Sequence, residues 1–152
     1  MKGRVAALAV VLIAAPFVVV EEGVVLTRYA DPVGVDTACV GETDNEIIGF
    51  KQVFSRDECI AVMGASLYAH AMKLEPCVKR DISRQQAAAL LSWSYNVGVG
   101  NACGSTLMKK LNAGQPWCAE LDTWVYAKGI KLPGLVKRRA AERRMCEVGS
   151  WQ

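Results

Sequence analysis

Residues 21–43, "EEGVVLTRYADPVGVDTACVGET", follow a long apolar run and place two carboxylates directly at its end. The run, residues 5–20, has the sequence "VAALAVVLIAAPFVVV" and carries no charge. Residues 24–50 contain β-branched side chains, glycines and an Asp-Pro pair without a helical apolar stripe, which predicts short strands and turns. The stretch is therefore either a spacer beside a membrane or a functional site whose first carboxylate must leave a membrane before it works.

The N-terminal run has the composition of a marginal membrane anchor. Lys2 and Arg4 precede it, which places the N-terminus in the cytoplasm and the rest of the chain outside. A helix of this length spans about 24 Å, short of the roughly 30 Å hydrocarbon core, and Pro16 weakens it further. The end of the run, "VVVEE" at residues 18–22, makes a poor signal-peptidase site. We therefore favour an uncleaved anchor over residues 1–20, with a cleaved signal peptide as the alternative, and a globular domain over residues 21–152.

The chain is long enough for one domain, and its positive charge is unevenly spread. It has 152 residues and a formal net charge of +3. Residues 128–144, "KGIKLPGLVKRRAAERR", hold seven basic residues against one acid. A basic surface of this kind favours an anionic polymer such as nucleic acid, anionic lipid or bacterial cell wall, although a solvated helix face has the same composition.

The chain has six cysteines, which is many for its length. No C-x-x-C pair occurs and there is one histidine, so a zinc site is not expected. An even number of cysteines behind an apolar segment indicates an oxidising compartment and disulfides. Fifteen pairings are possible. We favour Cys118 with Cys146 because both fall on predicted C-terminal helices, and a mixture of disulfides and buried thiols is the alternative.

Helix signals are clear beyond residue 50. "SRDE" at residues 55–58 and "SRQQ" at residues 83–86 are capping boxes, each of which opens a helix. The glycines of "NVGVGN" end the second of these helices, Gly114 closes a short one, and Pro116 suits the first turn of the next. The predicted helices cover residues 55–73, 83–97, 105–113, 116–126 and 135–148. The fold class is α+β, with a small β-rich lobe joined by a long helix to a larger helical lobe.

Three polar residues in the opening stretch are candidates for chemistry. Glu22 is expected to close the first helix, Asp31 lies nine residues further on, and Thr37 follows six residues later. A helix end that faces a turn across a cleft can hold such groups on opposite sides of a substrate. The spacing alone is a weak signal, because an N-terminal acid, a turn aspartate and a strand threonine also arise by chance.

The order of several motifs along nearly the whole chain gives a much more specific signal. Together they resemble the phage lysozymes of glycoside hydrolase family 24, and more closely the lambdoid endolysins with a signal-arrest-release segment. The resemblance implies a lysozyme-like fold and hydrolysis of the β-1,4 bond between N-acetylmuramic acid and N-acetylglucosamine in peptidoglycan, for host cell lysis. The matching motifs are Glu22-Gly23, Tyr29-x-Asp31, Thr37-x-Cys39-x-Gly41-x-Thr43, "YNVGVGN" at residues 95–101, "STLMKKLN" at residues 105–112 and "GLVKRRAAER" at residues 134–143.

The resemblance assigns roles to individual residues. Glu22 corresponds to the general acid, Asp31 to the group that positions or activates the water, and Thr37 to a contact of that water. Tyr95 and Asn96 correspond to residues that line the cleft from the helical lobe. Cleavage of a glycosidic bond needs such a division of labour, because one group protonates the leaving oxygen and another manages the water or the cationic sugar.

Two further positions bear on the site. Arg139 is the expected partner that holds Glu22, and its neighbour Arg138 is the open alternative. The family often has histidine where this chain has Glu42, so a stabilising histidine–acid pair between the lobes is expected to be missing.

The apolar run cannot lie in a bilayer and pack on the enzyme at the same time. We therefore expect an inactive form tethered to the host inner membrane, with its catalytic domain in the periplasm, that becomes active on release. The resemblance implies that collapse of the membrane potential triggers this release. It also implies peptidoglycan as the partner and no nucleic-acid partner, no cofactor, no metal and a monomer.

Two other functions are compatible with the same pattern. A lytic transglycosylase cleaves the same bond without water and typically needs the glutamate alone, whereas Asp31 and Thr37 favour hydrolysis. A membrane-anchored wall-binding protein without activity is the second alternative, and the complete set of Glu22, Asp31 and Thr37 argues against it.

Overall fold

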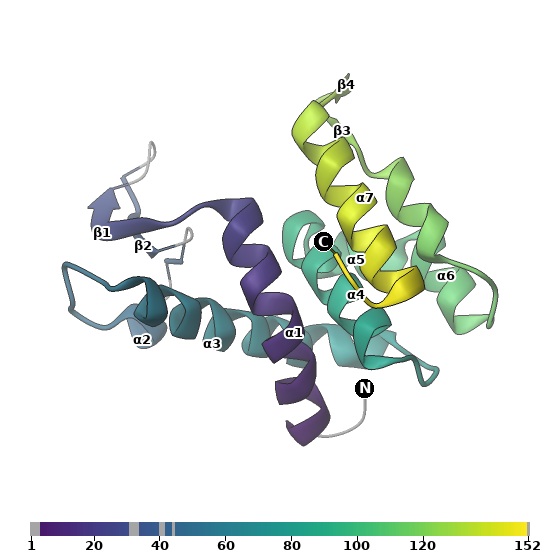
Figure 1. Cartoon of the computed structure of the whole chain (residues 1–152), viewed down its shortest axis with the longest axis horizontal. Helices are drawn as coiled ribbons and strands as arrows, with labels where there is room; N and C mark the ends of the chain where they lie inside the picture. Colours follow the sequence, from purple (N-terminus) through teal and green to yellow (C-terminus); the bar gives the residue numbers. More distant parts are fainter. Residues whose placement is uncertain (1–3, 31–33, 40–41, 44, 152) are drawn as a thin grey trace.

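The computed structural model describes residues 4–30, 34–39, 42–43 and 45–151, and its two lobes have the predicted α+β architecture (Figure 1). The small lobe contains an antiparallel pair of strands and a short helix, and a long helix leads from it into the helical lobe. These elements are β1 (Val25–Ala30), β2 (Asp36–Cys39), α2 (Asn45–Ile48) and the long helix α3 (Arg56–Leu74).

The helical lobe matches the sequence in its main helices and differs in its connections. The helices predicted from residues 83, 105 and 135 are present. The lobe consists of η1 (Glu75–Cys77), α4 (Arg84–Val97), α5 (Val99–Gly104), α6 (Thr106–Asn112), η2 (Cys118–Thr123), β3 (Tyr126–Ala127), β4 (Ile130–Lys131) and α7 (Pro133–Val148), where η denotes a 3-10 helix.

The helix predicted over residues 116–126 is wrong. Trp117 leaves the helical region, so η2 is a 3-10 helix that begins only at Cys118. A hairpin follows, because Lys128 and Gly129 both have positive φ and reverse the chain. The short helix α5 was also not predicted, since a single left-handed glycine, Gly98, separates it from α4.

Helix α1 (Arg4–Glu22) packs across α3 and α4 and supplies a large part of the core. Phe17 and Val18 are completely buried, and the Phe17 ring packs on Trp151 with 5.3 Å between the ring centroids. Its solvent-facing stripe repeats every four residues: Leu8, Leu12, Pro16 and Val20. Within the described part of the chain, no helix is both long enough and apolar enough to cross a membrane.

Both predicted capping boxes are present. The Ser55 hydroxyl accepts the Glu58 backbone N–H at the start of α3, and the Glu58 carboxylate accepts the Ser55 N–H at 2.7 Å. Ser83 and Gln86 make the same reciprocal pair at the start of α4. Each box satisfies two backbone donors that the first helical turn leaves without a partner.

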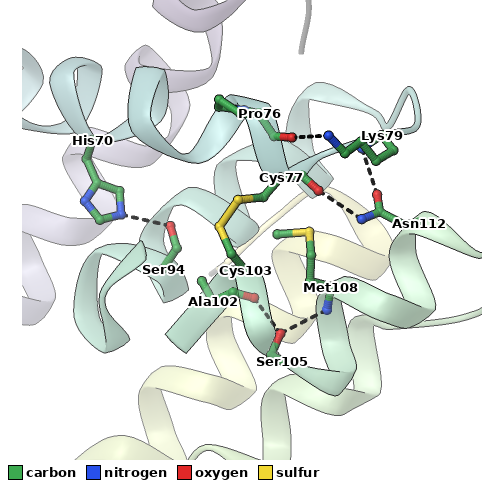
Figure 2. The surroundings of a disulfide bond; sticks show 10 residues. All are labelled: His70, Pro76, Cys77, Lys79, Ser94, Ala102, Cys103, Ser105, Met108 and Asn112. Atoms are coloured by element: carbon green, nitrogen blue, oxygen red, sulfur yellow. Dashed lines mark hydrogen bonds between the residues drawn. A yellow bond between two sulfur atoms is a disulfide. The ribbon is translucent and has the colours of Figure 1, made fainter. Parts of the chain in front are cut away.

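Three disulfides tie neighbouring elements together. Cys39–Cys59 joins β2 to α3, Cys77–Cys103 joins η1 to α5, and Cys118–Cys146 joins η2 to α7, the pairing favoured from the sequence. Figure 2 shows Cys77–Cys103, beside which the Asn112 side chain donates to the Cys77 carbonyl and accepts from the Lys79 N–H. Loops of this length give each disulfide roughly 3 kcal/mol in the chain-entropy model.

Glu58 makes the α3 cap sensitive to acid. Hydrogen bonds from the Lys51 side chain and then from Ser55 lower the pKa of Glu58 from 4.5 to about 2. The stabilisation is therefore complete above the unfolded pKa and is lost as the pH falls towards about 2. We expect Glu58→Gln to unfold at lower urea concentration than the parent near neutral pH, with this gap closing as the pH falls through that window.

The matched control is Asp81→Asn. Asp81 is exposed and has no hydrogen bond or ion pair among the described residues, so the gap between this variant and the parent should not change with pH. If the difference in unfolding midpoint between Glu58→Gln and the parent stayed constant as the pH falls, this account of the cap would be contradicted.

Candidate active site

Glu22 is the last residue of α1, and the next residue turns the chain into the small lobe. Gly23 has a φ of +76°, a left-handed conformation that glycine adopts without strain. The Glu22 side chain is 30% exposed, and its Oε1 accepts from Arg138 Nη1 at 2.5 Å. The helix end therefore presents a carboxylate that a cation holds in one orientation while one side faces solvent.

The residue that holds Glu22 is Arg138, the alternative left open by the sequence, rather than Arg139. Consecutive residues on a helix point about 100° apart, so only one of the two can face α1. The Arg139 guanidinium is turned towards α4 and is completely buried, where its Nη2 donates to the Asn96 side-chain oxygen at 3.1 Å. Arg139 therefore supports the site indirectly, through its hydrogen bond to Asn96 on α4.

One buried carboxylate connects the two arginines. Glu142 Oε2 lies 2.9 Å from Arg139 Nε, and Glu142 Oε1 accepts from Arg138 Nε at 3.3 Å. Ser92 on α4 donates to the same Oε1 at 2.7 Å. We call Arg138, Arg139, Glu142 and Ser92 the arginine–glutamate cluster. The cluster joins α7 to α4 and, through Glu22, both helices to α1.

The burial of this cluster has opposing electrostatic effects. Desolvation raises the pKa of Glu142, while Arg139, Ser92 and Arg138 act in the other direction. Desolvation likewise lowers the pKa of Arg139, and the attraction of Glu142 opposes that shift. Each buried charge therefore depends on its partner for stability.

Tyr95 and Asn96, the two residues predicted to line a cleft, lie near the C-terminal end of α4 beside this cluster. The Tyr95 hydroxyl is 3.0 Å from Ser66 Oγ, and its ring packs edge-on against His70. His70 in turn bonds Ser94 through its ring nitrogen, as Figure 2 shows. Burial raises the pKa of Tyr95, and the charges of Glu42 and Glu22 raise it further, so the phenol stays neutral. Asn96 is exposed apart from its bond to Arg139.

The small lobe carries the remaining candidates. Thr37 is buried on β2 opposite Tyr29, and its hydroxyl donates to the Val35 carbonyl at 2.9 Å. Asp31 lies outside the described residues. Glu42 is buried and pairs with the Ala38 backbone in an isolated bridge.

The structure thus brings Glu22, Tyr95 and Asn96 together around the arginine–glutamate cluster, of which Arg139 is a member. Thr37 lies on the other lobe, and no hydrogen bond joins it to Glu22 within the described residues. Sequence reasoning missed Ser66, Ser92 and Glu142, which support the site. Glu142 alone had a detectable signal, because it is the single acid inside the basic run of residues 128–144.

Comparison with known proteins fits this arrangement. The family model described as phage lysozyme matches residues 20–142. The chain belongs to the phage lysozyme family. It is 40% identical over 130 residues to a SAR-endolysin of Bacteriophage PS119, covering 84% of this chain and 77% of the relative. A SAR-endolysin of Enterobacteria phage P21 is 39% identical over 130 residues, covering 84% of this chain and 78% of the relative.

Solved structures support the same fold. An endolysin from Escherichia coli O157:H7 phage FAHEc1 superposes with a TM-score of 0.77 at 22% identity, covering 92% of this chain and 94% of that one. A mutant P22 lysozyme gives a TM-score of 0.74 at 23% identity, covering 87% and 93%. This phage lysozyme family member is therefore an endolysin and a lysozyme-type glycosidase.

The arginine–glutamate cluster predicts a large difference between two glutamates on the same helix. Glu142→Gln removes the carboxylate that pairs with the buried Arg139 guanidinium and leaves Arg138 with Glu22 alone, which should lower the free energy of unfolding by about 3–5 kcal/mol. Glu147, one turn further on, makes an exposed pair with Arg143, so Glu147→Gln should cost less than about 1 kcal/mol. Urea denaturation of both variants measures the difference, and equal losses would show that the cluster does not hold the fold.

Proposed function

We propose that this endolysin hydrolyses the β-1,4 bond between N-acetylmuramic acid and N-acetylglucosamine in peptidoglycan, with Glu22 as the general acid. The observation that carries the proposal is the ion pair of Glu22 with Arg138 at the junction of the two lobes. It fixes a partly exposed carboxyl group at the end of α1, next in the chain to the strand pair that contains Thr37. The substrate is the one that the resemblance to phage lysozymes implies.

In the proposed reaction, Glu22 first takes up a proton from water and then donates it to the glycosidic oxygen as the bond to the anomeric carbon breaks. A water molecule adds to that carbon, and Asp31 positions this water or accepts its proton. Thr37 suits the contact with the water, because its hydroxyl hydrogen is already donated to Val35 and its oxygen remains an acceptor. Arg138 faces the carboxylate that proton transfer leaves on Glu22.

Tyr95 and Asn96 are proposed to contact the sugar chain from the helical lobe. Asn96 is held by Arg139, which leaves its amide nitrogen as a donor towards a hydroxyl or acetamido group. Tyr95 offers the face of a half-buried ring whose hydroxyl is already engaged by Ser66. The enzyme is proposed to act as a monomer.

The proposal includes a tethered state in which residues 1–20 lie in the host inner membrane, the N-terminus faces the cytoplasm and residues 21–152 lie in the periplasm. The composition of α1 supports this state. A helix packed on a water-soluble protein normally shows polar residues to solvent, but the exposed stripe here contains Leu8, Leu12 and Val20. Apolar residues on every face suit a helix that also has to lie in lipid.

Activation would then follow from geometry. Phe17 and Val18 cannot be buried against α3 and α4 while α1 is in lipid, so Glu22 would be kept away from Arg138. Release of α1, triggered by collapse of the membrane potential, would complete the core and the site together and leave the active enzyme in the periplasm.

Glu22→Gln tests the catalytic role against a matched neighbour. We expect purified peptidoglycan to be cleared by the parent and about 10²–10⁴-fold more slowly by Glu22→Gln, because the proton donor is lost. Glu21→Gln removes an equal charge from the adjacent exposed position and should leave the rate unchanged. Equal rates for parent and Glu22→Gln would mean that Glu22 is not the acid.

Product analysis separates hydrolysis from the transglycosylase reaction. Reducing N-acetylmuramic acid ends are expected, and anhydro-muramic ends would show cleavage without water. If neither parent nor variant clears peptidoglycan although both are folded, the protein would be an inactive wall-binding protein.

Leu12→Arg tests the tethered state without disturbing the enzyme. Leu12 lies at the middle of the apolar run and is 76% exposed in the folded protein. An arginine there should destabilise the membrane-inserted helix by about 2.5–3.5 kcal/mol while leaving the packed face of α1 intact. Fractionation of cells should show more variant protein in the soluble fraction, with unchanged activity per molecule. Leu12→Ala is the control, and its distribution between the membrane and soluble fractions should match that of the parent. An active parent in the membrane fraction would contradict the proposal.

A further inference from the structure

The hairpin before α7 forms a projecting tip that the proposed function does not use. We call residues 126–137, which comprise β3, β4 and the first turn of α7, the hairpin tip. In Figure 1 it extends beyond the N-terminal end of α7, at the top of the view. Every residue from 126 to 134 is exposed. The tip is therefore a surface feature with little role in the core.

The exposed side chains of the hairpin tip are largely apolar. Tyr126 and Ile130 are 60% and 66% exposed, and Leu132 and Val136 are also exposed. Tyr126 lies opposite Lys131 and Ile130 opposite Ala127, so both faces of the hairpin carry a large apolar side chain. A hollow of about 350 Å³ lies between Lys131, Pro133, Val136 and Lys137, lined almost wholly by apolar surface. Several large apolar residues gathered on one exposed feature mark an interaction surface.

The charge of the hairpin tip has a single sign. Lys128, Lys131 and Lys137 are exposed, and no ion pair joins them to a carboxylate in the described ranges. Residues 123–141 contain no aspartate or glutamate. Arg138 and Arg139 are turned inward to the arginine–glutamate cluster, so these three lysines carry the positive charge that the surface presents.

This combination of groups decides between the anionic partners. A cell-wall glycan presents hydroxyl and acetamido groups, which suit polar side chains and aromatic rings, whereas aliphatic side chains such as Ile130 and Leu132 gain most by leaving water for lipid. Lysines around an apolar centre are typical of proteins that lie on anionic membranes.

We infer that the hairpin tip docks the folded enzyme on an anionic lipid surface, with Tyr126, Ile130 and Leu132 at the headgroup boundary and the three lysines against the headgroup charges. This contact uses a surface distant in sequence from α1 and does not require α1 to enter the bilayer. The proposed contact of the hairpin tip with lipid therefore does not depend on the tethered state.

Flotation of the full chain with vesicles tests the inference. Vesicles of phosphatidylethanolamine and phosphatidylglycerol should bind the parent, vesicles of phosphatidylcholine should bind it far less, and added salt should weaken binding. Replacing Lys128, Lys131 and Lys137 with Gln should weaken binding by about 100-fold, from roughly fivefold per lysine. Tyr126→Ser with Ile130→Ser should weaken it by at least about tenfold.

Matched variants distinguish the hairpin tip from α1 and from a general effect of positive charge. One control removes two similarly exposed apolar residues from α1, by Leu12→Ser with Val20→Ser. The other control removes three positive charges elsewhere on the surface, by Lys73→Gln, Arg84→Gln and Lys109→Gln. Both sets should keep vesicle binding. All tip variants should keep the parent's rate on purified peptidoglycan, which shows that they are folded.

A position-specific signal completes the test. The fluorescence of Tyr126→Trp, corrected for the parent, should shift to the blue on vesicles and be quenched by brominated lipid. Absence of vesicle binding by the parent would overturn the inference. So would binding lost in the α1 variant but kept in the tip variants, or tip variants that lose binding to purified cell wall but not to vesicles.

Discussion

The structure depends on one buried carboxylate shared by two arginines. Glu142 lies between Arg138 and Arg139, and both guanidinium groups are buried, so their charges need nearby carboxylates to offset the loss of water. Three helices meet at this point, because the α7 residues bond to Ser92 and Asn96 on α4 and to Glu22 on α1. The orientation of Glu22 is thus a consequence of how the helical lobe packs, and the site and the core share the same interactions.

A second constraint acts on α1, which has to provide both the buried face of an enzyme and, in the proposed cycle, a membrane segment. Burial of side chains such as Phe17 and Val18 contributes about 1.5–3 kcal/mol each to the folded state. The stripe through Leu12 gains nothing from folding, since it faces water. Its apolar composition is a cost to the folded enzyme, and the membrane-bound form of the same helix in the proposed cycle would explain it.

The sequence predicted those features that local chemistry controls. The capping boxes at Ser55 and Ser83 were predictable because each is a reciprocal pair four residues long. The hairpin after η2 was missed because no secondary structure was predicted for residues 127–134, and its strands are only two residues long on either side of two left-handed residues. Motif order assigned Glu22, but the choice between Arg138 and Arg139 depends on the rotation of α7 about its axis, which packing sets and a basic run does not reveal. Long-range polar contacts of this kind follow from tertiary structure alone.

The disulfides explain why, in the proposed cycle, docking of α1 on the rest of the protein is enough to complete the enzyme. Cys39–Cys59 fixes β2, and with it Thr37, to the beginning of α3 without any help from α1. Cys118–Cys146 similarly fixes η2 to α7, the helix that carries the arginine–glutamate cluster. Both sides of the site are thus held by bonds that do not involve α1. Two residues, Gly23 and Val24, separate Glu22 from β1, so a helix that docks on the body has little freedom in where it places its last carboxylate. In the proposed cycle, release of α1 supplies the last missing element of a site whose other parts are already assembled.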